Sequence, residues 1–255
     1  MANTTQFKET SGLPRGFVAA CALAFIASAL ATAHFCRSMC CQMDMPGGWS
    51  MSMMWMRMPG QSWFAFAASF LLMWTAMMVA MMLPSALPAF LRTKRAAISL
   101  CVIATGYFAV WAAFGVIMYA LGVELATATM QWENLSRAVP MLSAVVLIAA
   151  GAFQFTRWKV NSLLRCRSSF GCACVCPERQ RDFQLGCRQG AACCLCCAGP
   201  MTVLIVLGLM NPAVMIAIAV VIAAEKLMPK PELIARISGA AAVITGLLLL
   251  ARIFF

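Results

Sequence analysis

The chain has 255 residues, of which 63% are hydrophobic and 11% are charged, and its mean hydropathy is +0.87. This composition excludes an ordinary water-soluble domain and indicates a membrane protein. The formal net charge of +11 does not indicate a nucleic-acid partner, because the basic residues fall in short stretches between apolar segments, where they set orientation in a bilayer. We therefore predict an all-α, polytopic bundle of about seven transmembrane helices in contact with lipid.

Sulfur is the unusual feature of the composition. The chain contains 14 Cys and 21 Met but one His and two Tyr. A disulfide scaffold is not expected in a mostly intramembrane chain of this size. Thiolate and thioether ligands select soft metals such as Cu(I), so the sulfur-rich segments are the candidate metal sites.

Residues 17–33 form the first apolar run, and we predict a retained span. A cleaved secretory signal is the alternative, because residues 31–33 resemble a cleavage site. We divide the chain into residues 1–62, with this span and an outer Met- and Cys-rich loop, and residues 63–255, a six-span membrane domain.

Residues 34–58 are rich in Met and interrupted by Pro and Gly, which predicts an exposed loop. Because thioethers bind Cu(I) and bind hard ions poorly, we interpret it as an outer, copper-collecting loop. One alternative is an interfacial loop anchored by Trp49, Trp55 and Trp63, and another is a disulfide among Cys36, Cys40 and Cys41. The candidate ligands are His34, Met43, Met45, Met51, Met53, Met54 and Met56.

The second span covers residues 63–83 and carries methionines at helical spacing. Met73, Met77 and Met81 form one i, i+4 row, and Met78 and Met82 form the adjacent row. The rows either pack in the core or pass a thioether-bound ion along the helix. Pro84 and Pro88 are predicted to break the helix.

Spans three and four, residues 97–121 and 139–155, are interpreted as scaffold. Residues 157–190 are predicted to form a cytoplasmic, Cys-rich loop. In it, Cys172, Cys174 and Cys176 alternate near arginines that favour the thiolate form, which indicates a secondary metal site. An incidental group of reduced thiols is the alternative.

Cys193, Cys194, Cys196 and Cys197 lie at the start of the fifth span, residues 191–210, which we expect to be broken near Pro200. In a helix, Cys193 lies beside Cys196 and Cys197, so two or three sulfur atoms face one side. This is the predicted main metal site. The alternative is that Cys acts here as a small packing residue.

Span six, residues 213–227, ends in Glu225 and Lys226, and span seven covers residues 233–251. With the N-terminus in the cytoplasm, 15 of the 19 Lys and Arg residues lie on the cytoplasmic side, which predicts that orientation in a cytoplasmic membrane. A carboxylate in an apolar run needs a partner, and Lys226 or a bound cation are the candidates for Glu225. The further candidate ligands at this membrane depth are Met77, Met78, Met81, Met82, Met201 and Glu225.

The ordered motifs resemble a bacterial family of predicted metal-binding integral membrane proteins, a domain of unknown function. The family's Ala-Met-Met-x-Pro-Ser pattern matches residues 80–85, and its second block matches Gly190, Cys193, Cys196, Cys197 and Met201. The later Met-Asn and Glu-Lys pairs match residues 210–211 and 225–226. Leu195, Ala198 and Ser162 stand where the family has Gly, Trp and Cys. The resemblance implies metal binding without implying a reaction.

We therefore predict a Cu(I)-binding membrane protein that transfers copper between the outer Met-rich loop and the inner Cys residues, with a copper chaperone or a metalloenzyme as partner. Zinc also suits four thiolates. The alternatives are a membrane subunit of a copper-dependent oxidoreductase and a thiol redox protein. We assign no catalytic residue, because the sequence has no phosphate-binding loop, no paired carboxylates in a plausible site and no nucleophile with a nearby His.

Overall fold

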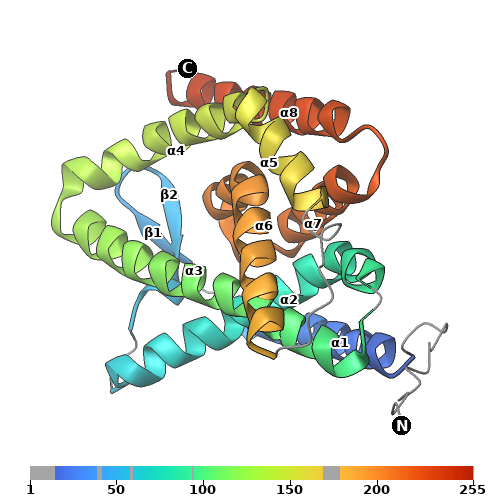
Figure 1. Cartoon of the computed structure of the whole chain (residues 1–255). Helices are drawn as coiled ribbons and strands as arrows, with labels where there is room; N and C mark the ends of the chain where they lie inside the picture. Colours follow the sequence, from blue (N-terminus) through green and yellow to red (C-terminus); the bar gives the residue numbers. More distant parts are fainter. Residues whose placement is uncertain (1–14, 39–41, 58–59, 94, 169–178, 255) are drawn as a thin grey trace, which may run out of the picture.

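The computed structural model describes residues 15–38, 42–57, 60–93, 95–168 and 179–254. Within these ranges the chain forms eight α-helices, one two-stranded antiparallel hairpin and a short 3₁₀ turn (Figure 1). In chain order the elements are α1 (Arg15–Ser38), β1 (Gln42–Met45), β2 (Trp49–Ser52), η1 (Met53–Trp55), α2 (Trp63–Arg92), α3 (Ala97–Gln131), α4 (Glu133–Phe153), α5 (Arg157–Ser168), α6 (Arg179–Gly208), α7 (Pro212–Leu227) and α8 (Pro231–Phe254). The predicted all-α bundle is confirmed.

Six of the described helices, α1, α2, α3, α4, α6 and α8, are long and apolar enough to cross a membrane. The sequence predicts about seven spans, and the difference is α7. This helix is apolar but has 16 residues, which corresponds to a length of about 24 Å. That is shorter than the hydrocarbon core of about 30 Å.

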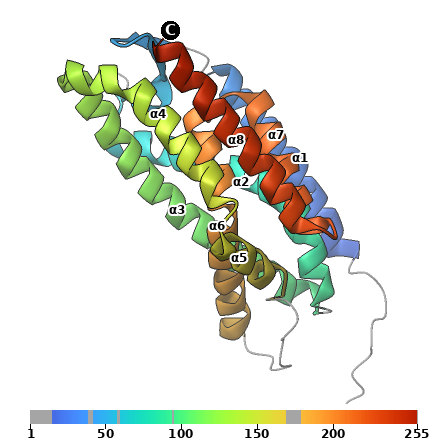
Figure 2. The same ribbon diagram turned by 90° about the horizontal axis from the view of Figure 1, so that it is seen from above.

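The elements divide between two ends of the bundle. The β1–β2 hairpin and the C-terminus lie at one end, which we call the hairpin end, and α5 lies toward the other, the α5 end (Figure 2). The predicted loop of residues 157–190 lies at the α5 end, but much of it is helical, because α5 and the first turns of α6 fall within it. Its candidate ligands Cys172, Cys174 and Cys176 lie outside the described residues.

Prolines do not end the helices at the predicted places. Helix α2 continues through Pro84 and Pro88, and α6 continues through Pro200. A proline inside a helix frees the carbonyl group four residues earlier, and in a membrane protein another group must satisfy it. In α4, Pro140 frees the carbonyl oxygen of Ser136, which accepts a 2.9 Å hydrogen bond from Trp49 Nε1 of the hairpin.

This hydrogen bond docks the Met-rich segment against the helices. Met45, Met51 and Met54 are buried, and Met45 and Met51 pack with Ala126 of α3 in a small core. The prediction of an exposed loop is therefore wrong for these three side chains. Local composition predicts the turn, but it does not show that α3 and α4 cover its methionines.

Glycines allow close helix packing, which is common in membranes. A Cβ atom on Gly186 of α6 would collide with the carbonyl oxygen of Ile103 in α3, and one on Gly106 would collide with the carbonyl oxygen of Phe183. In the α4–α8 pair, a Cβ atom on Gly239 would come within 2.8 Å of the carbonyl oxygen of Gly151. The contacts at Gly106 and Gly186 fix the distance between α3 and α6 near the buried cysteines of α6.

We predict that Gly186→Ala lowers the stability of the purified protein by about 1–3 kcal/mol, because the added methyl group must push α3 and α6 apart. Thermal unfolding in a non-ionic detergent measures the effect. Gly16→Ala is the matched control, since nothing lies within 4 Å of a Cβ atom at that position. Equal unfolding midpoints for Gly186→Ala and the control would contradict the close approach.

Candidate metal centre

Three buried cysteines meet at the α5 end. The Sγ atoms of Cys166, on α5, and of Cys193 and Cys196, on α6, all lie within 4.8 Å of one another. We call these three residues the thiol cluster. In the described part of the chain, it is the one group of three or more His, Cys, Asp or Glu side chains close enough to share a metal ion. Three sulfur ligands at this spacing suit a soft metal.

The two α6 members are adjacent to a third buried cysteine, as the helical spacing predicts. Cys197 Sγ lies 3.8 Å from Cys193 Sγ and 3.6 Å from Cys196 Sγ. Cys196 Sγ also donates a hydrogen bond to the carbonyl oxygen of Cys193. Cys194 is half-buried and is not part of the cluster. The sequence therefore identifies one face of α6 correctly, with Cys194 on a different side.

Cys166 completes the cluster from a second helix. Gln189 Nε2 donates a 2.9 Å hydrogen bond to the Cys166 carbonyl oxygen, which holds α5 against α6. The pKa of the Cys166 thiol is raised to about 12, first by its hydrogen bond with Cys193 and further by burial. A raised pKa favours the neutral thiol, so a metal ion that binds Cys166 must displace its proton.

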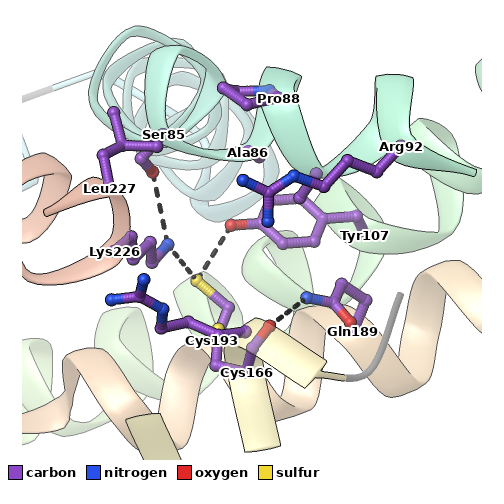
Figure 3. A pocket seen from close by; sticks show the side chains of 12 residues that line it. Ser85, Ala86, Pro88, Arg92, Tyr107, Cys166, Gln189, Cys193, Lys226 and Leu227 are labelled. Carbon is purple, nitrogen blue, oxygen red and sulfur yellow. Dashed lines mark hydrogen bonds between the residues drawn. The ribbon is translucent and has the colours of Figure 1, made fainter. Parts of the chain in front are cut away.

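Two donors converge on Cys193 Sγ (Figure 3). Tyr107 Oη donates a 2.9 Å hydrogen bond from α3, and Lys226 Nζ donates another of 2.9 Å from α7. Lys226 Nζ also lies 3.3 Å from Ser85 Oγ and 3.9 Å from Met82 Sδ, both on α2. A sulfur atom that accepts a hydrogen bond from an ammonium group is in a setting that favours negative charge.

Of the two candidate partners of Glu225, a bound cation and Lys226, the second is replaced by another lysine. Its carboxylate forms a 2.7 Å ion pair with Lys159 Nζ, and both side chains are fully buried. Gln154 Nε2 and Ser238 Oγ donate further hydrogen bonds to the same carboxylate, at 3.4 and 3.3 Å. Lys226 follows Glu225 directly, so the two side chains project about 100° apart around the helix, and Lys226 reaches Cys193 instead. The predicted Glu225–Lys226 pair is wrong.

Lys159 also links this ion pair to the thiol cluster. Pro200 has no N–H group to donate to the Cys196 carbonyl oxygen four residues earlier. Lys159 Nζ donates a 2.5 Å hydrogen bond to that oxygen. Pro200, which was expected to break α6, therefore leaves the Cys196 carbonyl oxygen free to accept the hydrogen bond that positions Lys159.

A cavity of about 40 Å³ opens beside the cluster. This volume exceeds the roughly 10–15 Å³ that one water molecule requires, so the space also admits a metal ion. Its lining residues come from α2, α3, α5, α6 and α7, and they are Ser85, Ala86, Pro88, Ala89, Arg92, Tyr107, Cys166, Arg167, Gln189, Cys193, Lys226 and Leu227.

The other predicted ligands fall into two groups. Met77, Met78, Met81, Met82 and Met201 are buried in the same core as the cysteines of α6. His34 is exposed on α1, and Met43 and Met56 are partly buried beside the hairpin core. The structure thus brings the α2 methionines and the α6 cysteines into one core.

Sequence reasoning did not identify Cys166, Lys159 or Tyr107 as parts of the site. Lys159 and Cys166 lie in a segment of high charge that resembles a cytoplasmic loop. Two signals were available: the replacement of a family cysteine by Ser162 one turn before Cys166, and the free carbonyl group that Pro200 requires at Cys196.

A family model, PpoB2, described as copper chaperone, matches residues 71–249. The chain belongs to this family. The matched range contains every motif on which the resemblance to predicted metal-binding membrane proteins depends, as well as all three members of the thiol cluster. No curated protein and no solved structure matches the chain. Family membership and the cluster together indicate copper handling by a multi-pass membrane protein.

We predict that Lys159→Met destabilises the protein by about 3–5 kcal/mol, because it leaves the Glu225 carboxylate buried without its ion-pair partner. Thermal unfolding in detergent measures the change. The control is the double variant Lys159→Met/Glu225→Leu, which removes both charges and should recover most of the lost stability. If the single and double variants unfold at the same temperature, the ion pair does not constrain the site.

Proposed function

We propose that the protein is a membrane copper chaperone that holds Cu(I) at Cys166, Cys193 and Cys196 and passes it to an acceptor protein. The observation that carries the proposal is the meeting of three buried Sγ atoms from two helices within 4.8 Å. Family membership over residues 71–249 supports copper as the metal. Copper is the cargo here, so the site must both bind and release it.

The ligand set favours Cu(I) over harder ions. Thiolates select Cu(I), whereas carboxylates and carbonyl groups suit magnesium, calcium and manganese. The nearby carboxylate of Glu225 is held by Lys159, which leaves sulfur as the ligand type at the cluster. Structural zinc sites almost always have four ligands, and the cluster of three is one short unless Cys197 joins it.

Buried methionines support a route through the bundle. Met54 at the hairpin end, the α2 methionines Met73, Met77, Met78, Met81 and Met82, and the cysteines of α6 belong to one continuous buried core. We propose that neutral thioethers pass Cu(I) along α2 to the stronger thiolate ligands. The α5 end then lies in the cytoplasm, as the distribution of Lys and Arg predicts.

Copper binding to the detergent-purified protein tests the site. We expect the wild type to bind one Cu(I) under anaerobic, reducing conditions, and Cys193→Ser or Cys196→Ser to weaken it by more than about 100-fold. The loss of a group that only supports a metal ligand already costs about 10–100-fold. A competition titration with a chromophoric Cu(I) chelator measures the affinity, and X-ray absorption reports sulfur ligation.

Cys194→Ser is the matched control, because Cys194 lies on the same turn of α6 but outside the cluster. It should bind copper as the wild type does. Binding of zinc in place of copper, or no metal binding together with reversible oxidation of the cluster thiols, would overturn the proposal. The second result would instead support a thiol redox protein.

The methionine route has a separate test. Met77→Leu/Met81→Leu conserves volume, so we expect the fold and the detergent-measured copper affinity to be kept. Copper uptake into proteoliposomes should fall in this variant, because Leu offers no ligand to the moving ion. Leu71→Met on the same helix is the control, since it conserves volume and leaves both methionine rows intact. Unchanged uptake in the double variant would remove the α2 methionines from the route.

A further inference from the structure

The opening of the cavity is basic. Among its described lining residues, Arg92, Arg167 and Lys226 are cationic and none is acidic. Arg92 is exposed, while Lys226 reaches inward to Cys193 Sγ. We call these three residues the basic opening. A hydrated cation that approached through it would meet three like charges, whereas an anion would be attracted.

Arg167 is held in place beside this opening. Its guanidinium group donates a 2.7 Å hydrogen bond to the carbonyl oxygen of Met228, which follows α7. Arg92 of α2 and Tyr107 of α3 line the same cavity as Lys226 (Figure 3). The three cationic side chains therefore line the same cavity as Cys166 and Cys193, the two cluster residues that a metal can reach from it.

The cavity also offers an unused hydrogen-bond acceptor. Gln189 is 4% exposed, and its Oε1 atom has no hydrogen-bond partner although its Nε2 atom is bonded to the Cys166 carbonyl oxygen. A buried acceptor without a partner is costly, by about 1–3 kcal/mol. A ligand that brings an N–H group into the cavity would satisfy it, whereas a bare Cu(I) ion would not, because this soft ion prefers sulfur to carbonyl oxygen.

We propose that copper crosses the basic opening as an anionic Cu(I)–thiolate complex of a small, amide-containing thiol. The inference rests on the proposed function and adds the chemical form in which this site exchanges copper. The cavity of about 40 Å³ holds the metal and its sulfur ligand, and the rest of the carrier lies outside against Arg92 and Arg167. The complex Cu(SR)₂⁻ carries one negative charge at its metal centre, and carboxylates of the carrier add to it.

The exchange balances without any redox change. Two copper–sulfur bonds to the carrier break, and two form to the Sγ atoms of Cys166 and Cys193, which line the cavity. Cys196 Sγ then completes the three-sulfur site as a neutral thiol ligand. Cys193 binds as the thiolate that accepts hydrogen bonds from Tyr107 and Lys226, and the proton of the Cys166 thiol moves to one released carrier thiolate. Cu(SR)₂⁻, one protein thiol and one protein thiolate thus give a protein-bound Cu(Sγ)₂⁻, one RSH and one RS⁻. Copper stays Cu(I), and the Lys226 ammonium group lies beside negative charge before and after the transfer.

The test compares two copper donors by stopped-flow mixing with the metal-free, full-length protein in a non-ionic detergent. One donor is the anionic Cu(I) complex of glutathione, and the other is the cationic tetrakis(acetonitrile)copper(I) complex. We expect Arg92→Gln/Arg167→Gln to slow loading from the glutathione complex by about 10-fold. Loading from the acetonitrile complex should be unchanged or faster, and the final copper stoichiometry should stay at the wild-type value.

Salt and charge-conserving variants complete the design. Wild-type loading from the glutathione complex should fall as ionic strength rises from about 0.01 M to about 0.15 M, since the Debye length shrinks from about 30 Å to about 8 Å. Arg92→Lys should restore most of the rate lost in Arg92→Gln, and Arg157→Gln, an exposed residue outside the cavity lining, should have no effect.

An unchanged glutathione rate in the double variant, or an equal loss of rate from both donors, would overturn the inference. Failure of the proposed function gives a different result, because wild-type protein would then take stoichiometric copper from neither donor.

Discussion

The site depends on one buried lysine that bridges three helices. Lys159 on α5 donates to the Glu225 carboxylate on α7 and to the Cys196 carbonyl oxygen on α6. A charged group away from water is stable only when it is paired, so these contacts leave α5 little freedom to move. Because Cys166 lies on the same short helix, this constraint holds its thiol beside the two thiols of α6.

Two adjacent residues at the end of α7, Glu225 and Lys226, contact two different groups of the site. Glu225 pairs with Lys159, while Lys226 turns toward Cys193 Sγ and would balance the negative charge of the proposed Cu(I)–thiolate centre. The separation follows from helical geometry, since consecutive side chains project about 100° apart. If two thiolates bound Cu(I) without Lys226 nearby, the net negative charge of the complex would lie unbalanced in a medium of low dielectric constant.

The sequence predicted the parts of the site that depend on local geometry. The common face of Cys193, Cys196 and Cys197 follows from helical spacing, and the buried methionine rows of α2 follow in the same way. Cys166 and Lys159 were missed, because only tertiary packing turns their charged segment into a helix that lies against α6. The predicted helix break at Pro200 failed for the same reason, since the compensating donor comes from another helix.

The proposed route leads from the methionines of α2 to the cysteines of the thiol cluster, and this order explains why a positive charge is needed at the α5 end. Thioethers are neutral, so a Cu(I) ion bound by methionines keeps its single positive charge, and removing that charge from water costs free energy. Two thiolate ligands instead convert the ion to an anionic centre. In the proposed route that change of sign would occur where α2 meets the thiol cluster, and Lys226 lies there, 3.9 Å from Met82 Sδ and 2.9 Å from Cys193 Sγ. A lysine at this point repels an incoming cation and attracts the thiolate complex that forms from it, and so favours copper on the cysteines over copper on the methionines.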